Sequence, residues 1–386
     1  MEELAKEHPV RDFVQQIDRF EQVDPEKEYQ LLGMRSRIAG PFIRETKQGT
    51  EISANKLNKV KQGDFIYSRL FAWQGSFGLI PAEMDGCYVS NEFPIFKLDN
   101  EKIISEYLVY WFALPHIQKR VEADCSGSTP GTRNRYKEIF FLSIQLPLPS
   151  IDEQQTIVSN IQSVSKKINE AKRLRQEILD DAQAMLLSAF QQIIEGAEYQ
   201  TMEKVAPIVR RKVEIEIDGE YPELGVRSFG KGTFHKPVLN GIDVGTKKLY
   251  HILPGDLVFS NVFAWEGAIA VVKKEDNNRT GSHRFITCIP KDKTTTSDFL
   301  CFYFLTNEGI EKIRDASPGG AGRNRTLGLK KLEQLTVPIP DYDKQIWFNA
   351  LQTKVADIKK AQADNQTELD ALLPAILDKA FKGELV

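Results

Sequence analysis

The chain has 386 residues, of which 41% are hydrophobic and 10% aromatic, so it can bury real cores and is not an intrinsically disordered protein. Its 51 basic and 54 acidic residues give a net charge of −3, which excludes a strongly basic nucleic-acid coat but leaves room for one basic face. The four cysteines lie far apart without Cys-x-x-Cys spacing, which argues against a disulfide framework or a zinc site. The apolar runs are far shorter than the ~18 residues that span a bilayer, and the charged N-terminus does not resemble a signal peptide. We therefore expect a cytoplasmic protein without a membrane partner.

The main feature of the sequence is an internal repeat. Four segments recur in the same order, 190 to 192 positions after their first copies. The paired segments are Tyr29–Ser36 with Tyr221–Ser228, Gly63–Gly75 with Gly255–Gly267, Arg133–Arg135 with Arg323–Arg325, and Leu146–Pro149 with Val337–Pro340. Matching order and offset predict a duplicated unit of about half the chain.

The first part of each copy is typical of a mixed α/β domain. We expect a short helix to open each copy, at Val10–Arg19 and at Met202–Arg211. Short β-like runs then alternate with turns rich in glycine and asparagine. These runs are Gly63–Leu70, Val89–Leu98, Leu253–Ser260 and Ala268–Val272. A Pro-x-Pro step ends the domain, because proline cannot continue a strand or helix.

A long helix is predicted after each Pro-x-Pro step, because apolar residues follow heptad spacing there. In the first helix these residues are Ile161, Val164, Ile168, Ala171, Ile178, Ala182, Met185 and Ala189. In the second they are Phe348, Leu351, Val355, Ile358, Leu369, Leu372 and Ile376, with Gln362 and Asn365 as polar breaks. Pro374 is expected to kink the second helix.

The predicted fold is α+β: two mixed α/β domains separated by two long antiparallel coiled-coil helices, related by a pseudo-two-fold internal repeat. The expected divisions are residues 1–150 for the first domain, 151–197 for the first helix, 198–340 for the second domain and 341–386 for the second helix.

This arrangement resembles the specificity subunit of Type I restriction-modification systems. The resemblance rests on two segments. One is the boundary segment Ile144–Val158, with Glu153 and Gln154 after its prolines, and the other is the closing Ala-Phe-x-Gly-Glu-Leu. The second boundary departs from the pattern, since Lys344 stands where the first has Glu153, although Gln345 is retained.

The resemblance implies that the two domains are target recognition domains, each reading one half of a split, asymmetric site in double-stranded DNA. It implies that the helices set the gap and dock two methyltransferase subunits, and that restriction subunits join for cleavage. It also implies no cofactor in this chain: S-adenosylmethionine would bind the methyltransferase subunits, and ATP and magnesium the restriction subunits.

Candidate DNA contacts follow from residue type and from the repeat. Glycine-rich loops precede Arg133, Asn134 and Arg135, and again Arg323, Asn324 and Arg325. A guanidinium can fork to phosphate or guanine, and an asparagine amide suits adenine. The Arg-Asn-Arg segments are identical in the two copies, whereas residues that read different half-sites should differ. This favours contact with phosphate over base reading. The alternative is a structural turn whose arginines pair with carboxylates.

Further candidates lie elsewhere in the two copies. Arg35 and Arg227 each follow a strand, where DNA contact and a core ion pair are both open. Positions that differ between copies are better suited to reading different half-sites: Arg69 against Asn261, Gln74 against Glu266, Asn91 against His283, and Glu92 against Arg284. The cluster Arg210, Arg211 and Lys212, with Arg19 as the counterpart of Arg211, is either a phosphate patch or a solvated helix end. Trp73 and Trp265 are interpreted as core residues.

The sequence offers no catalytic motif. Gly225–Lys231 matches a phosphate-binding loop until Gly232, where a magnesium-binding Ser or Thr should stand. No nucleophile, metal cluster or cofactor loop can be named either. We therefore expect a non-catalytic DNA-reading subunit. The alternative, which these residues disfavour, is a stand-alone DNA-modifying enzyme.

Overall fold

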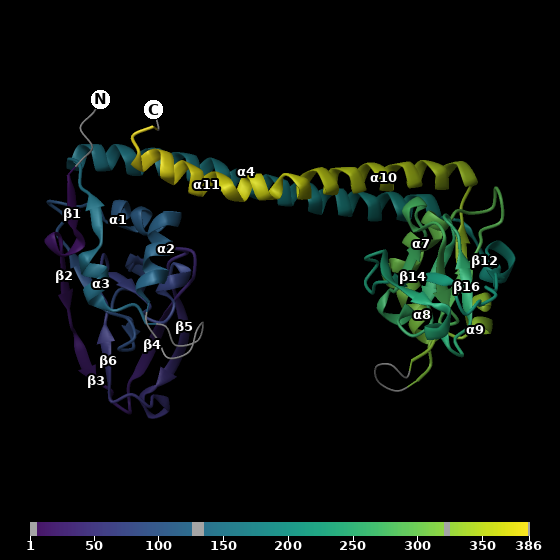
Figure 1. Ribbon diagram of the computed structural model, residues 1–386, viewed down its shortest axis with the longest axis horizontal. Coiled ribbons are helices and arrows are strands. Elements are labelled where there is room, and N and C mark those ends of the chain that lie inside the picture. Colours follow the sequence, from purple (N-terminus) through teal and green to yellow (C-terminus); the bar gives the residue numbers. More distant parts are fainter. Residues whose placement is uncertain (1–5, 126–134, 320–324, 385–386) are drawn as a thin grey trace. The chain divides into compact units, whose positions relative to one another are not determined.

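The computed structural model describes residues 6–125, 135–319 and 325–384 (Figure 1). The chain forms two compact units. Unit 1 comprises residues 1–175 and 363–386, and unit 2 comprises residues 176–362. Each unit therefore contains one domain and parts of the long helices.

Unit 1 contains two main sheets. The first has five strands in the order β3-β6-β9-β4-β5, and the second has four in the order β2-β10-β7-β8. Their bounds are β2 (Val14–Ile17), β3 (Phe20–Gln22), β4 (Glu28–Met34), β5 (Pro41–Gln48), β6 (Lys56–Lys59), β7 (Phe65–Tyr67), β8 (Phe77–Leu79), β9 (Tyr88–Val89) and β10 (Ile95–Leu98). A separate pair joins β1 (Glu7–Pro9) to β11 (Gln145–Pro147).

Aromatic side chains form the centre of unit 1. The helices α1 (Ser105–Phe112), α2 (Pro115–Asp124) and α3 (Glu138–Ser143) contribute to this core. The ring centroids of Phe77 and Phe112 are 4.6 Å apart, and those of Phe65 and Phe141 are 5.5 Å apart. Such buried aromatic pairs fix the position of the loops that emerge from the sheet.

Unit 2 repeats this plan. Its sheets have the orders β15-β14-β19-β16 and β13-β20-β17-β18, and β12 pairs with β21. The strand bounds are β12 (Glu198–Thr201), β13 (Ile208–Val209), β14 (Glu220–Val226), β15 (Thr233–Asn240), β16 (Leu249–Ile252), β17 (Leu257–Ser260), β18 (Ile269–Val271), β19 (Arg279–Ser282), β20 (Phe285–Cys288) and β21 (Thr336–Ile339). Its helices are α5 (Met202–Val205), α6 (Gly241–Val244), α7 (Ser297–Leu305), α8 (Asn307–Asp315) and α9 (Leu329–Gln334).

The repeat extends to individual residue pairs. The parallel contact of β4 with β9 joins Leu31 to Tyr88, and that of β14 with β19 joins Glu223 to Thr280, each residue 192 positions later. The fifth strand of unit 1, β3, is represented in unit 2 by the single bridge between Lys212 and Tyr250. The predicted internal repeat and α+β fold are confirmed.

The predicted opening helices begin at the expected residues, Val10 and Met202, but their predicted length is wrong. In unit 1 only one turn, Val10–Asp12, is helical before β2 pairs with β10. In unit 2, α5 ends at Val205, and Ile208 and Val209 then pair with β20. Pairing with a buried neighbouring strand outweighs the local helical pattern, and Pro207 also disfavours helix in the residue before it.

The long helices are α4 (Ile151–Ile194), α10 (Tyr342–Asp364) and α11 (Gln366–Phe381). In unit 1, α11 runs antiparallel to α4: Lys172 pairs with Asp370 at 2.6 Å, while Ile161 and Leu377 enter the same core. In unit 2, α10 also runs antiparallel to α4: the Lys359 ammonium donates to Gln183 at 2.8 Å, and the Phe190 and Phe348 rings are 5.5 Å apart. Among the described residues, no helix combines the length and apolarity needed to cross a membrane.

The predicted heptad pattern is confirmed only in part. Ile161, Ile168, Ala182, Ala189, Phe348 and Val355 are buried as expected, whereas Ile178, Met185, Ile358 and Leu372 are 41% to 48% exposed. Towards its end α4 packs on the domain of unit 2 as well as on α10, through Leu186 and Phe190, so the buried face leaves the heptad register. The second helix is interrupted at Asn365, one of the predicted polar breaks, and α11 continues through Pro374.

A buried glutamine joins each helix to its domain. The Gln154 side chain accepts from the Ile104 N–H at 2.9 Å and donates to the Lys102 and Pro149 carbonyls at 2.9 and 3.0 Å. Gln345 accepts from the Thr295 hydroxyl at 2.9 Å and donates to the carbonyls of Thr294 and Pro340 at 3.1 and 2.9 Å. These bonds use the donors and acceptors of both amides, and they explain why both boundaries contain a glutamine.

Candidate nucleic-acid interface

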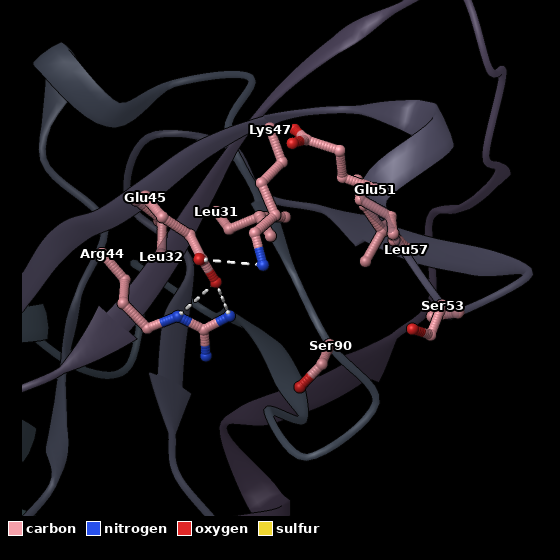
Figure 2. Close-up of a pocket in the computed structure, with 11 residues that line it drawn as sticks. Leu31, Leu32, Arg44, Glu45, Lys47, Glu51, Ser53, Leu57 and Ser90 are labelled. Atoms are coloured by element: carbon pink, nitrogen blue, oxygen red, sulfur yellow. Dashed lines mark hydrogen bonds and ion pairs between the residues drawn. The ribbon is translucent and has the colours of Figure 1, made fainter.

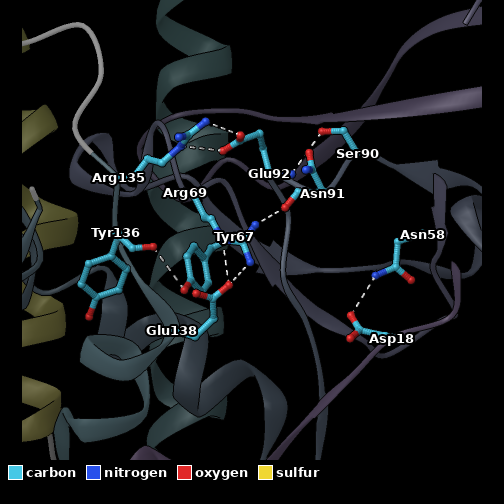
Figure 3. A network of polar contacts seen from close by, with 10 residues as sticks. All are labelled: Asp18, Asn58, Tyr67, Arg69, Ser90, Asn91, Glu92, Arg135, Tyr136 and Glu138. Carbon is cyan, nitrogen blue, oxygen red and sulfur yellow. Dashed lines mark hydrogen bonds and ion pairs between the residues drawn. The ribbon is translucent and has the colours of Figure 1, made fainter. Parts of the chain in front are cut away.

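The structure gathers several of the predicted contact residues of unit 1 (Figure 3). The Arg69 N–H donates to the Glu92 carbonyl, and the Tyr136 N–H donates to the Arg69 carbonyl, both at 2.9 Å. The Arg69 side chain also donates to the Asn91 carbonyl. Arg69, Asn91, Glu92 and Arg135 therefore meet, although they come from three separate segments.

Both arginines of this cluster are paired with carboxylates. The Arg69 Nε donates to Glu138 Oε1 at 2.7 Å. Arg135 forms a bidentate pair with Glu92, with Nη2 to Oε1 at 2.5 Å and Nε to Oε2 at 3.2 Å. Any contact of these guanidinium groups with DNA must therefore share or replace a carboxylate partner.

The equivalent surface of unit 2 has different chemistry. The Asn261 N–H donates to the Arg284 carbonyl, and the Leu327 N–H donates to the Asn261 carbonyl, both at 2.8 Å. Arg210 donates to the Phe285 and His283 carbonyls at 3.0 and 3.4 Å. The structure therefore brings together Asn261, His283, Arg284 and Arg210.

Arg325 lies beside this cluster, with its guanidinium 5.3 Å from the centroid of the Trp265 ring. Arg133, Asn134, Arg323 and Asn324 lie outside the described residues. Arg284 stands where unit 1 has Glu92, and Leu329, the first residue of α9, stands where unit 1 has Glu138, the first residue of α3. The two glutamates that pair with arginines in unit 1 thus have no counterparts in unit 2.

Arg35 and Arg227 play the same local role in the two units. Each stacks on a phenylalanine of the next strand, 4.9 Å from Phe42 and 4.8 Å from Phe234. Each also donates to a backbone carbonyl, Arg35 to Pro41 at 3.3 Å and Arg227 to Thr233 at 2.7 Å. The alternative of a core ion pair is wrong, because both side chains are exposed and bond to the backbone.

Gln74 and Glu266 also occupy matched positions. Gln74 accepts a hydrogen bond from the Ser36 hydroxyl, and Glu266 accepts one from the Ser228 hydroxyl, both at 3.0 Å. These bonds tie the turn after β4 or β14 to the short 3-10 helix at Ala72–Gln74 or Ala264–Glu266.

The basic cluster at the start of unit 2 separates into three environments. Arg211 forms a bidentate pair with Asp256 at 2.6 and 3.0 Å, as Arg19 does with Asp64 at 2.5 and 3.0 Å. Both aspartates are 4% exposed, and the hydrogen bond to Asp256 raises the pKa of Arg211. Arg211 is thus a structural brace. Lys212 pairs at the surface with Glu214, and Arg210 stacks 4.8 Å from Tyr250.

The interpretation of Trp73 and Trp265 as core residues is wrong. Both rings are half-buried, and their indole N–H groups donate to the Leu70 and Val262 carbonyls at 3.1 and 2.9 Å. Trp265 lines a cavity of about 470 Å³ together with Phe229, Leu305, Ile310 and Arg314. Each tryptophan lies on a tight turn that ends at a glycine with positive φ, which keeps the ring near the surface.

Sequence reasoning missed two residues of this region. Arg37 (φ 57°) and Phe229 (φ 61°) occupy matched positions in the turns that follow β4 and β14, and both are exposed. Their types share nothing, so the repeat did not single them out. The only signal was the glycine-rich stretch from Gly225 to Gly232, which was tested solely as a phosphate-binding loop.

A second cavity, of about 180 Å³, lies beside β4 and β5 of unit 1 (Figure 2). Three of its charged groups are paired, since Glu45 contacts Lys47 at 3.0 Å and Arg44 at 2.5 Å, and the fourth, Glu51, accepts from the Gln48 N–H. The Lys47 and Arg44 partners lower the pKa of Glu45. The lining also contains the hydroxyl groups of Ser53 and Ser90.

The cysteine thiols are poor nucleophiles. Burial raises the pKa of Cys125 to about 11 and that of Cys288 to about 12, so neither is a thiolate at neutral pH. Within the part of the chain that the structure describes, no group of three His, Cys, Asp or Glu side chains could hold a metal ion.

Comparison with known proteins identifies the first domain. Residues 25–179 match the family model of the Type I restriction modification DNA specificity domain. No curated protein sequence matches the chain.

Two solved structures share the fold over nearly the whole chain. One is the HsdS subunit from Thermoanaerobacter tengcongensis, with a TM-score of 0.61 and 18% identity, covering 99% of this chain and 97% of that one. The other belongs to a type I R-M system solved for its complex assembly and conformational transition, with a TM-score of 0.70 and 19% identity, covering 98% of each chain. The resemblance found in the sequence is confirmed: residues 25–179 match the Type I restriction modification DNA specificity domain, and the whole chain shares the fold of the HsdS subunit and of the chain from the type I R-M system.

Proposed function

We propose that this chain is the non-catalytic specificity subunit of a Type I restriction-modification complex. Each unit would read one half of a bipartite, asymmetric site in double-stranded DNA. The observation that carries the proposal is the pair of matched surfaces: one framework, repeated strand by strand, that presents Arg69 and Glu92 in unit 1 and Asn261 and Arg284 in unit 2. A repeated framework with different polar side chains suits two half-sites of different sequence.

The long helices would set the distance between the half-sites and dock two methyltransferase subunits. The structural neighbour from a type I R-M system was solved for its complex assembly, which supports partner subunits for this chain as well. Restriction subunits would join for cleavage. S-adenosylmethionine would bind the methyltransferase subunits, and ATP and magnesium the restriction subunits, so this chain would hold no cofactor.

The test is reconstitution with the methyltransferase partner. The isolated chain should neither methylate nor cut DNA. With the partner and S-adenosylmethionine, the complex should methylate adenine within a split site, which methylation-sensitive sequencing of the treated DNA would identify. The partner would flip the adenine while this chain holds the register. Methyl transfer or cleavage by the isolated chain would instead support a stand-alone enzyme.

A further inference from the structure

The turns after β4 and β14 share one backbone framework. The N–H groups of Arg37 and Ile38 donate to the Gln74 and Gly75 carbonyls at 2.8 and 2.7 Å. In unit 2, the N–H groups of Phe229 and Gly230 donate to the Glu266 and Gly267 carbonyls at 2.8 and 2.9 Å. Each turn is therefore held against the 3-10 helix that carries the tryptophan.

This framework places strained residues at matched positions. Among the described residues, five non-glycine residues have positive φ, and three of them are Arg37, Ile38 and Phe229. Side chains disfavour this region, whereas glycine adopts it freely, as Gly230 does. Glycine at positions 37 and 229 would make the folded state more stable. Residues held in such conformations cluster at functional sites.

The side chain at position 229 is apolar and exposed among cations. Phe229 is 73% exposed. Lys231 lies 5.8 Å from its ring, and Arg314 lines the same cavity. The rest of the lining is apolar at Trp265, Leu305 and Ile310, and its one carboxylate, Glu266, is bonded to the Ser228 hydroxyl. Cations around an exposed aromatic ring suit a polyanion that also offers apolar groups, as DNA does through the C5-methyl group of thymine.

The side chain at position 37 has the opposite chemistry. Arg37 is exposed and forms no ion pair within the described residues. Hydrogen bonds from Lys172 and Gln366 lower the pKa of Asp370, and the charge of Arg37 adds to this effect, while Asp370 itself pairs with Lys172. The neighbouring group is polar too, because Gln118 lies where Gly75 closes the turn. A guanidinium in this setting suits the O6 and N7 acceptors of guanine.

We propose that Arg37 and Phe229 are a matched pair of base-reading residues, Arg37 for a guanine in one half-site and Phe229 for a thymine C5-methyl group in the other. The proposal rests on the proposed function and deepens it. Because the two turns share their backbone, the half-sites would differ in part through this single position.

The test removes single groups from the DNA. In duplexes carrying the site found by methylation mapping, each thymine is replaced in turn by deoxyuridine, which lacks only the methyl group. Each guanine is replaced in turn by 7-deazaguanine, which lacks N7. Binding is measured with the full chain assembled with its methyltransferase partner.

One deoxyuridine should weaken binding of the natural complex about fourfold, the factor expected for one buried methyl group. One 7-deazaguanine in the other half-site should weaken it about tenfold, as for loss of a good arginine–guanine contact. Phe229→Gly should abolish the deoxyuridine effect and leave the 7-deazaguanine effect, and Arg37→Gly should do the reverse.

The glycine variants remove backbone strain, so a loss of DNA reading in them cannot be attributed to misfolding. Both should unfold at a higher denaturant concentration than the natural chain while reading DNA less well. Asn278→Gly is the matched control, since Asn278 also has positive φ (62°) in unit 2. It should leave both base effects intact.

Equal deoxyuridine effects in the natural chain and in Phe229→Gly would overturn the assignment of Phe229, and equal 7-deazaguanine effects in Arg37→Gly would overturn that of Arg37. Loss of methyltransferase binding in Phe229→Gly would assign that residue to a protein interface instead. In all these cases the natural complex would still prefer its split site. A natural complex without any half-site preference would refute the proposed function itself.

Discussion

Units 1 and 2 share their strand order but differ in the charge of their candidate surfaces. In unit 1, Glu138 and Glu92 bind the guanidinium groups of Arg69 and Arg135. In unit 2, the positions of these glutamates hold Leu329 and Arg284. The duplication therefore preserved the backbone and changed the charges that it displays. Under the proposed function, the unit 1 surface would exchange internal ion pairs for contacts with DNA, whereas Arg284 makes no ion pair in the described part of the chain.

The largest effect on DNA binding is expected from a change in the distance between two intact units. Insertion of seven residues after Ser163 in α4, with seven more after Ala356 in α10, lengthens each helix by ~10 Å. At 3.4 Å per base pair, the preferred gap should widen by up to about 3 bp. Binding to the original site should fall by orders of magnitude, while both half-sites stay unchanged in methylation mapping. A changed half-site with an unchanged gap would show that the helices are not the spacer.

The buried glutamines Gln154 and Gln345 should contribute equally to the stability of the two units. Gln154→Leu or Gln345→Leu leaves buried carbonyls and donors without partners, which should lower the free energy of unfolding by about 3 kcal/mol. Guanidinium unfolding of the full chain measures this loss. Gln155→Leu is the control on the same helix, and because Gln155 is exposed it should change stability by less than about 0.5 kcal/mol. Equal losses in Gln154→Leu and Gln155→Leu would contradict the role of the buried amide.

The divergent positions should separate the half-sites. Arg69→Ala should relax base preference in one half-site and Asn261→Ala in the other, by ~1–3 kcal/mol if a bidentate base contact is lost. Arg69→Ala also releases Glu138, so Glu138→Gln serves as its control. Competition binding against point variants of each half-site measures the effect. An even loss of affinity across all point variants would mean that Arg69 positions the domain and does not read bases.

The charge difference should appear in the salt dependence of binding. Glu92→Gln removes the carboxylate partner of Arg135, so affinity should rise on all sequences and the slope against log salt should steepen by up to about one unit. Arg284→Ala in unit 2 should flatten the slope by about one unit. Titration at several salt concentrations on specific and random duplexes measures both. Identical slopes for Glu92→Gln and the natural chain would mean that Arg135 stays away from phosphate.

The smallest expected difference between the two units is in the loss of stability at acidic pH. Burial disfavours the charge of Asp276 in unit 2, but the Lys273 N–H, the Thr233 hydroxyl and His235 outweigh it and lower the pKa of this carboxyl below its usual 3.8. A lowered pKa stabilises the fold above pH ~4, and this stability is lost as the pH falls through the pKa of the folded state.

Unit 1 has Ile43 and Met84 at the positions of His235 and Asp276. Asp276→Asn should therefore lose less stability than the natural chain when the pH falls from about 5 to about 3. Urea unfolding at each pH would reveal the difference, and parallel profiles for the two proteins would argue against it.

Much of the fold could be predicted from the sequence, because the repeat fixed which segments correspond. The long helices were found from periodicity, and α4 extends over 44 residues. The opening helices were not, because the pairing of Val14–Ile17 with β10 depends on a strand about 80 residues away. The heptad pattern also could not indicate where α4 begins to pack on the domain of unit 2 in addition to its partner helix.

The site was less predictable than the fold. Residue types and divergence between copies identified Arg69, Asn91 and Arg135, which the structure brings together. Their glutamate partners could not be predicted, because ion pairs between residues that are distant in sequence leave no local pattern. The φ angles of Arg37 and Phe229 cannot be read from those residue types, which normally avoid positive φ.

The buried glutamines determine how freely the recognition domains can be exchanged. All three bonds of Gln154 go to main-chain atoms, so any domain that offers the same backbone path to this helix can replace the first one, whatever its side chains. Gln345 differs in one bond, because its carbonyl accepts from the Thr295 hydroxyl. A transplanted second domain must therefore bring a hydroxyl at that single position. The two domains thus differ in how freely each could be replaced, and under the proposed function such a replacement would change one half-site.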